Sequence, residues 1–371
     1  MARPRAEVTG KDECSLEWVP GVATVTHRTA WPGLAGTLFA SGTSEDWNEP
    51  MDPDVTPSSP APGTGSGSGE GAPLRHGQET PEDRPARLAV GVVGAGRVGT
   101  ALGVALSRAG HRVVAAAAVS ERSRSRVEDR LPGAGVAPPP EVVAAADLVL
   151  LTVPDDALPE LAGGLVSAGV PVTGKLIMHT SGRYGTSVLE PLTRAGALPL
   201  ALHPVMTFTG RPDDVNRLTG ISFGVTSPEP LRPVAEALVL EMGGEPVWIT
   251  EDARPLYHAA LAGGANHLVT LVVEAMDLLG AAGVAEPGRM LGPLLGAALD
   301  NGLRLGIDGL TGPVARGDAG TVSGHLDQLA KVSPQSRLAY IAMARLTADR
   351  ALAAGMLKPE DAERLLEALA D

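Results

Sequence analysis

The hydrophobic pattern becomes regular at residue 88 and opens with a strand, a glycine-rich turn and a helix. Leu88 to Val93 is a nearly unbroken apolar run, which is typical of a central parallel strand covered on both faces. Apolar residues then recur at helical spacing from Val98 to Ala109, and Gly110 ends this helix. The pattern therefore predicts a buried strand joined to a helix by a short turn.

Three glycines form this turn, and their spacing predicts a dinucleotide site. Gly94 permits a tight turn, Gly96 lets the backbone approach a pyrophosphate, and Gly99 allows the helix to pack closely on the strand. The helix begins near Arg97 and Val98, where free N–H groups can face the phosphates. A purely structural turn is the alternative, but the strand before it and the helix after it favour cofactor binding.

Strands and helices keep alternating to about residue 250. The expected strands are 112–119, 147–153, 175–179, 198–203, 221–226 and 247–250, with helices that include 186–195 and 231–242. This order predicts an α/β fold with a Rossmann-type, doubly wound parallel sheet. Ligands of such sheets lie beyond the carboxyl ends of the strands. We therefore expect Val153 and Pro154 at the cofactor, and Ser181 and His203 on the substrate side of the cleft.

From residue 252 onward the pattern predicts helices only. Long apolar helices are expected at 253–282 and 287–303, followed by three shorter or more polar ones. The predicted domains are an acidic tail (1–86), a dinucleotide-binding domain (87–251) and a helical domain for substrate binding and dimerisation (252–371). The long helices carry more apolar surface than one helical layer can cover, so we expect a homodimer through them.

Residues 1–86 show no sustained periodicity, and their second half is rich in Pro, Gly, Ser and acidic residues. Such a composition buries too little apolar surface to offset chain entropy, so a disordered tail is expected. Three of the four tryptophans, Trp18, Trp31 and Trp47, nevertheless lie there. Residues 1–86 could be a segment that binds a partner. Alternatively, they could be a dispensable extension, or the start site could be placed too far upstream.

Composition narrows the classes of partner. The 371-residue chain has a formal net charge of −13 and no basic stripe, which argues against nucleic-acid binding. Cys14 is the only cysteine, which fits a reducing cytoplasm and excludes a disulfide framework. No apolar run is expected to span a membrane, and no metal site is expected. The sequence therefore predicts a cytoplasmic protein that acts on a small molecule.

The residues after the second strand bear on the choice between NADP and NAD. NADP sites carry small polar and arginine residues for the 2′-phosphate, whereas NAD sites carry an acid for the ribose hydroxyls. Ser120, Arg122, Ser123 and Arg124 follow the strand, which favours NADP(H) as the cofactor. Glu121 could instead act as the ribose acid, and an ordinary solvated helix start is a further alternative.

Motifs along residues 87–371 resemble a known bacterial family. They are Gly94-Ala-Gly-Arg-Val-Gly99, Thr152-Val-Pro-Asp-Asp156, His179-Thr-Ser-Gly182, His203-Pro-Val-Met-Thr-Phe208, Tyr257-His258, Asn266-His267, and Leu310-Thr-Gly-Pro-Val-Ala-Arg-Gly-Asp318 with Thr321 and His325. In that family a Rossmann-like, NADP-oxidoreductase-type domain precedes a C-terminal domain of unknown function. The family is similar in plan to pyrroline-5-carboxylate reductase, ketopantoate reductase and the 6-phosphogluconate dehydrogenase-like superfamily. The resemblance implies an NADP-dependent oxidoreductase with a helical second domain.

The resemblance also points to catalytic residues on the first long helix of the second domain. β-Hydroxyacid dehydrogenases carry Lys and Asn four residues apart on that helix. Asn266 resembles the Asn, but Ala262 stands where the Lys would be. His258, two steps of four residues before Asn266, could supply the missing proton. The alternative for His258 is a packed, hydrogen-bonded histidine.

A glycine-containing loop from Thr311 to Thr321 could hold the substrate. Arg316 could pair with a carboxylate, and Asp318 could cap the helix that starts near Thr321. This loop resembles the one that holds the substrate carboxylate in pyrroline-5-carboxylate reductase. The resemblance implies that Arg316, Asp318 and Thr321 lie at the substrate. The alternative is a purely structural loop with an Arg–Asp pair.

The predicted function is NADPH-dependent reduction of a small carbonyl or imine substrate that bears a carboxylate. A ketopantoate-like 2-oxo acid is the first substrate to test, by analogy with the family. Two alternatives remain open: a non-catalytic NADP-binding or regulatory protein, and a deazaflavin-dependent oxidoreductase.

Overall fold

The chain divides into two compact units, Met1–Glu251 and Asp252–Asp371. The computed structural model describes residues 16–19, 22–25 and 87–370. Most of the predicted tail therefore lies outside the described residues. The part of it that is described is an antiparallel ribbon of β1 (Leu16–Val19) and β2 (Val22–Val25), which the sequence analysis did not predict.

An eight-stranded sheet forms the centre of the first unit, in the order β10-β9-β8-β7-β6-β3-β4-β5. The strands are β3 (Ala89–Val93), β4 (Arg112–Ala117), β5 (Gly135–Val136), β6 (Leu148–Leu151), β7 (Leu176–His179), β8 (Leu198–Pro204), β9 (Ser222–Thr226) and β10 (Glu245–Trp248). Every neighbouring pair is parallel except β8 and β9, which are antiparallel. The chain order reverses between β3 and β6, so the ligand-binding switch point of a Rossmann sheet lies there. This topology confirms the predicted fold class.

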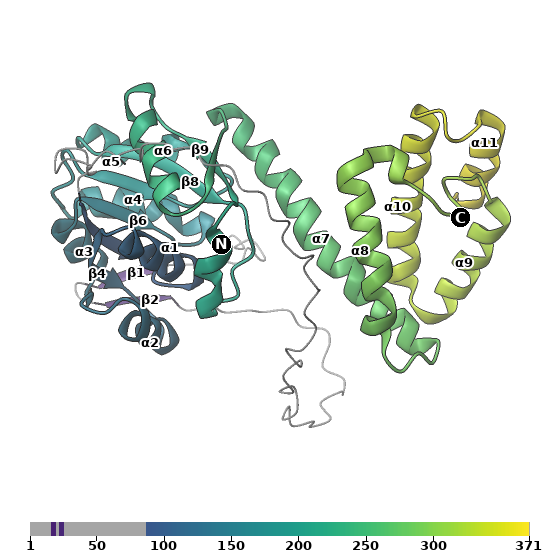
Figure 1. Cartoon of the computed structure of the whole chain (residues 1–371), viewed down its shortest axis with the longest axis horizontal. Coiled ribbons are helices and arrows are strands. Elements are labelled where there is room, and N and C mark those ends of the chain that lie inside the picture. The colour runs from purple at the N-terminus through teal and green to yellow at the C-terminus, as the bar shows by residue number, and fades with distance from the viewer. Residues whose placement is uncertain (1–15, 20–21, 26–86, 371) are drawn as a thin grey trace, which may run out of the picture. The chain divides into compact units, whose positions relative to one another are not determined.

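Helices cover both faces of the sheet (Figure 1). One face carries α1 (Arg97–Arg108), α2 (Glu121–Arg130), α6 (Arg232–Glu241) and the 3₁₀ segment Pro212–Leu218; the other carries α3 (Pro139–Ala145), α4 (Leu158–Ser167) and α5 (Glu190–Arg194). Along β3, Val90 and Val92 enter the first core and Val93 the second. Because both faces are covered, the central strands β3 and β6 are apolar throughout, as the unbroken runs predicted.

The second unit is all helical, as expected. Its helices are α7 (Arg254–Ala281), α8 (Pro287–Leu305), α9 (Ala319–Val332), α10 (Pro334–Ala353) and α11 (Pro359–Ala368). The core of this unit comes from α9, α10 and α11, with Val322, Ile341 and Leu365 among its buried side chains. By contrast, α7 and α8 each contribute one buried residue, Arg254 and Leu291. Most apolar side chains of these two helices are therefore exposed.

Among the described residues, one helical stretch, Glu251–Ala281, is long and apolar enough to cross a membrane by length and composition alone, since an 18-residue part of it has a mean hydropathy of 1.3. The stretch is not an unbroken apolar run, because His258, Asn266 and Glu274 interrupt it, so the expectation about apolar runs stays a prediction. A helix whose apolar side packs on another protein surface has the same composition. Length and composition by themselves are therefore weak evidence for a membrane span.

Candidate functional site

The glycine turn after β3 packs against the end of β6, at the switch point of the sheet. Gly94 has φ +93°, a conformation that L side chains rarely adopt, and its carbonyl accepts a hydrogen bond from Thr152 Oγ1 at 2.6 Å. A Cβ on Gly99 would collide with Thr152 Oγ1 and lie 2.6 Å from Gly94 O. A Cβ on Gly96 would meet only Gly94 O, at 3.9 Å. The protein's own packing therefore requires Gly94 and Gly99, whereas the space beside Gly96 is open to a ligand.

The N-terminus of α1 supplies donors to this open space. Gly96 is the N-cap residue and has no side chain with which to cap the helix. The first turn of α1 also contains no acidic residue that would repel an anion. The first N–H groups of a helix have no intrahelical acceptor, so those of Arg97 and Val98 are available to an anion. Val153 Cγ1 lies 3.1 Å from where a Gly94 Cβ would be, and Pro154 follows it. These residues fit a dinucleotide pyrophosphate.

The residues after β4 form the start of α2. Ser120 Oγ accepts from Ser123 N at 3.1 Å, and Ser123 Oγ donates to Ser120 O at 2.7 Å. Both hydroxyls are thus engaged in capping the helix. Arg122 and Glu121 are exposed on the first turn. Of the residues predicted to read the 2′-phosphate here, Arg122 is the one whose side chain has no hydrogen bond or ion pair among the described residues.

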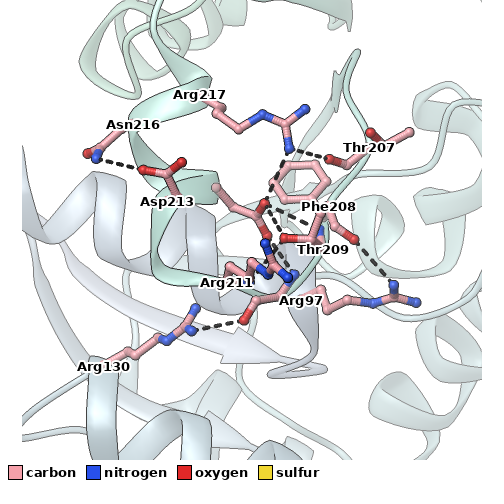
Figure 2. Close-up of polar contacts among 11 residues, drawn as sticks. Arg97, Arg130, Thr207, Phe208, Thr209, Arg211, Asp213, Asn216 and Arg217 are labelled. Atoms are coloured by element: carbon pink, nitrogen blue, oxygen red, sulfur yellow. Dashed lines mark hydrogen bonds and ion pairs between the residues drawn. The ribbon is translucent and has the colours of Figure 1, made fainter. Parts of the chain in front are cut away.

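The segment between β8 and β9 reaches back to α1 and α2, which the sequence analysis missed (Figure 2). Arg97 Nη1 donates to Phe208 O at 3.3 Å, and Arg130 Nη2 donates to Gly210 O at 2.8 Å. Arg126 Nη2 lies 3.4 Å from where a Gly210 Cβ would be. The only signal in the sequence was the spacing of arginines four residues apart in α2.

A buried carboxylate holds this segment in place. Asp214 is 1% exposed and accepts from Thr209 N at 3.2 Å, from Thr209 Oγ1 at 2.9 Å and from Gly210 N at 2.7 Å. Burial by itself would raise the pKa of Asp214, but these hydrogen bonds, with Arg217 3.6 Å away, lower it below the usual range. The ionised carboxylate therefore fixes the turn at Thr209 and Gly210.

The side chains of His179, the last residue of β7, and of Ser181 in the loop after it are hydrogen-bonded to the backbone. His179 is fully buried; its Nδ1 accepts from Ser181 N at 3.2 Å, so its Nε2 carries the proton and donates to Gly185 O at 2.8 Å. Ser181 Oγ accepts from Arg183 N and Tyr184 N. These bonds give both residues a structural role in the loop. His203, on β8, is half-buried.

Glu251 closes the same loop from the far end of the first unit. Its carboxylate accepts from Thr186 N at 2.8 Å and Ser187 N at 3.1 Å, and from both hydroxyls of these residues. Burial opposes ionisation, but the four hydrogen bonds outweigh it and lower the pKa of Glu251. Gly185 is required beside it, because a Cβ there would collide with the carboxylate.

The predicted catalytic residues lie on α7. His258 is half-buried and Asn266 is exposed. Eight residues of helix separate their backbones by about 12 Å along the axis, so the two side chains can flank one small molecule but not contact the same atom. Near the start of α7, the guanidinium of the fully buried Arg254 lies 5.7 Å from the centre of the Tyr257 ring. Burial, partly offset by Arg254, raises the pKa of Tyr257.

In the loop before α9, the predicted residues divide into two roles. Asp318 is the N-cap: it accepts from Thr321 N at 3.0 Å and Thr321 Oγ1 at 2.6 Å, which lowers the pKa of Asp318. The Asp318 and Thr321 side chains are thus bonded to each other. Arg316 is exposed, and within the described part of the chain it forms no ion pair.

A neighbouring pair on the same unit was not assigned from the sequence. His325 Nδ1 and Tyr340 OH are 2.9 Å apart, with the rings edge to face. Both side chains lie on the unit that carries Arg316, and His325 is exposed. They add titratable groups to the polar surface around the cap of α9.

Two protein-family descriptions match the sequence: "Rossmann-like domain" over residues 74–204 and "Domain of unknown function (DUF2520)" over residues 221–347. These matches confirm the resemblance seen in the motifs. A curated relative, the glycerol-3-phosphate dehydrogenase (NAD(P)+) of Azorhizobium caulinodans, is 32% identical over 226 residues, which are 57% of this chain and 63% of the relative. The chain is therefore homologous to NAD(P)-dependent oxidoreductases, although it spans less than two thirds of that relative's length.

Solved structures show the same fold. A candidate NADP oxidoreductase from Bacteroides fragilis matches with a TM-score of 0.60 at 24% identity, over 71% of this chain and 98% of that one. A reductive aminase from Aspergillus terreus, solved with NADPH and ethyl levulinate, matches with a TM-score of 0.56 at 19% identity, over 76% of this chain and 99% of that one.

Proposed function

We propose that this chain, which joins a Rossmann-like domain to a DUF2520 domain, is an NADPH-dependent reductase of a small carbonyl or imine substrate that bears a carboxylate. The observation that carries the proposal is the glycine turn at the switch point, where the protein's packing uses Gly94 and Gly99 but leaves the space beside Gly96 open. Homology to NAD(P)-dependent oxidoreductases supports the reaction class.

The first unit would hold the dinucleotide. The turn and the N-terminus of α1 would receive the pyrophosphate, and Val153 and Pro154 would border it at the end of β6. When bound, the nicotinamide supplies a hydride. Preference for NADP(H) is supported by the arginines that follow β4 and by the absence of an ion pair to Arg122 among the described residues.

Side chains of the second unit would handle the proton and the carboxylate. His258 would donate the proton to the acceptor oxygen or nitrogen, because histidine is the commonest general acid in enzymes. Asn266, about two helical turns away, would donate a hydrogen bond to another part of the same substrate. Arg316 would bind the carboxylate, since a guanidinium pairs with it through two parallel hydrogen bonds. Asp318 and Thr321 support Arg316 by fixing the loop rather than by touching substrate.

One observation favours a second function, a non-catalytic NADP-binding protein. Ala262 stands where related dehydrogenases carry a lysine, so this chain has no ammonium group at that position. The two functions differ in one measurable property, which is turnover of a bound dinucleotide.

The test is NADPH oxidation by the full chain against a panel of 2-oxo acids and cyclic imines. We expect turnover of at least one compound, and expect Gly96→Ala to lower it at least about tenfold at limiting NADPH while the fold is retained. Tight NADPH binding with no turnover across the panel would favour the binding protein. Failure to bind either NADPH or NADH would refute both functions.

We also propose that the chain is a homodimer formed through α7 and α8. These helices leave large apolar side chains exposed, including Val269 (62%), Leu294 (65%) and Leu303 (79%). A helix face with several large, exposed apolar side chains is typical of a protein interface. A second copy is the occupant that we favour, because each copy presents the same apolar face and twofold pairing covers both at once.

A further inference from the structure

Three arginines of α2 and one of α1 form an uncompensated basic cluster. Arg122, Arg126 and Arg130 are spaced four residues apart and share one side of α2, and Arg97 is the first residue of α1. Among the described residues, no carboxylate forms an ion pair with any of the four. Like charges at this spacing destabilise a helix.

The mutual repulsion in this cluster centres on Arg126. Its half-buried guanidinium has a lowered pKa, first because of burial and then because of the positive charges of Arg122, Arg130 and Arg97. Three acidic residues, Glu121, Glu128 and Asp129, lie on the same helix, but among the described residues none of them forms an ion pair with these arginines. An anionic ligand would remove the repulsion.

The backbone turn at 207–211 completes this cluster (Figure 2). Arg97 and Arg130 each donate one hydrogen bond to it, to Phe208 O and Gly210 O. A guanidinium has five N–H donors, so both side chains are oriented by the turn and retain donors for a ligand. Gly210, with φ +83°, is required there, because a Cβ would lie 2.9 Å from Arg97 Cγ.

We infer that Arg97, Arg126 and Arg130, oriented by the turn that Asp214 fixes, bind the phosphate monoester on the adenosine ribose of the cofactor. This inference rests on the proposed function and specifies which residues select the phosphorylated dinucleotide. It adds these arginines to the predicted residues Ser120, Arg122 and Ser123, of which the two serine hydroxyls cap α2. Asp214 is a positioning residue, since it touches the turn and not the ligand.

The charge of the ligand explains the selectivity. A phosphate monoester carries a charge of about −1.5 to −2 at neutral pH and three acceptor oxygens, whereas the ribose hydroxyl that replaces it in NAD is uncharged. The arginine cluster therefore gains charge-assisted hydrogen bonds only with NADP. With NAD the repulsion among the guanidiniums is left in place.

The test compares the dissociation constants of NADP+ and NAD+ for the full chain by titration calorimetry. Arg126→Gln should weaken NADP+ binding about tenfold or more and change NAD+ binding by less than about twofold. Arg126→Lys, which keeps the charge, should restore part of the loss. The matched control is Arg194→Gln on α5, where the guanidinium pairs with Glu190 on the other face of the sheet, and it should leave both constants unchanged.

Asp214→Asn tests the positioning role, because it keeps the size of the side chain but removes its charge. The ratio of the two dissociation constants should fall toward one, which a general loss of stability would not produce. The arginine assignment is overturned if both dinucleotides bind and Arg126→Gln either weakens the binding of both equally or weakens the binding of neither. The proposed function would still stand. If the unmodified chain binds neither dinucleotide, the proposed function fails first.

Discussion

Alanine substitutions at the N-cap Gly96 and at two glycines of α1, Gly99 and Gly103, separate packing from ligand binding. At Gly99 a new Cβ would collide with Thr152 Oγ1 and lie 2.6 Å from Gly94 O and 2.9 Å from Val92 Cγ1. Two of these neighbours belong to the turn and the sheet, so α1 must shift, at about 1–3 kcal/mol. For a unit of this size, 1 kcal/mol corresponds to about 2–4 °C in Tm. We expect Gly99→Ala to melt several degrees lower and to lose cofactor affinity.

Gly96→Ala should separate the two effects. Its φ of −80° is open to alanine, and the new Cβ would meet only Gly94 O, at 3.9 Å. We expect the free energy of unfolding to change by less than about 1 kcal/mol, because a weaker N-cap is offset by lower entropy of the unfolded chain. The methyl group would occupy the space for the pyrophosphate, so dinucleotide affinity should fall at least about tenfold, or about 1.4 kcal/mol.

Gly103→Ala is the matched control in the same helix. Its Cβ would lie 3.2 Å from Leu131 Cδ2, the end of a flexible side chain, and alanine favours the helix by up to about 1 kcal/mol. Stability and affinity should both be retained. The assays are thermal melting without ligand and titration with NADPH. If Gly96→Ala binds NADPH as tightly as the unmodified chain, the turn does not hold the pyrophosphate, and the reasoning from its geometry is refuted.

Three further predictions concern stability, assembly and chemistry. Glu251→Ala should lower the free energy of unfolding by about 1–3 kcal/mol, because two backbone N–H groups lose their acceptor, whereas Glu190→Ala, which removes an exposed ion pair, should not. The folded-state pKa of Glu251 lies below the unfolded value of about 4.3, so Glu251 stabilises the fold at neutral pH, and this stabilisation is lost as the pH falls through the folded pKa. A urea midpoint that is unchanged between pH 7 and acid would contradict this. Leu294→Asp should turn a dimer into monomers in sedimentation, and an unmodified chain that is monomeric at micromolar concentration, or that partitions into vesicles, would exclude the proposed interface. His258→Ala should lower kcat about 10²-fold and leave NADPH affinity unchanged; full activity of this variant would remove His258 from the mechanism.

Periodicity and local turn chemistry determined most of the fold in advance. The unbroken apolar runs predicted strands covered on both faces, and the three glycines predicted the strand–turn–helix unit, because only glycine fits the backbone angles at Gly94 and the contact at Gly99. The cap of α9 by Asp318 was also predicted, since a cap involves residues three positions apart in the chain. Each of these features depends on neighbours in sequence.

Contacts between segments that are distant in the sequence could be known only from the tertiary structure. The apolar run of β9 is compatible with either direction, and its antiparallel pairing with β8 is set by the connection through the turn at 207–211. That same connection brings Phe208 and Gly210 to Arg97 and Arg130, residues 111 and 80 positions away. Likewise, the motif that suggested Ser120 and Ser123 as phosphate ligands could not show that their hydroxyls cap α2. A hydroxyl or guanidinium has the same sequence signal whether it binds a ligand or its own backbone, and only the positions of its neighbours in space decide between the two.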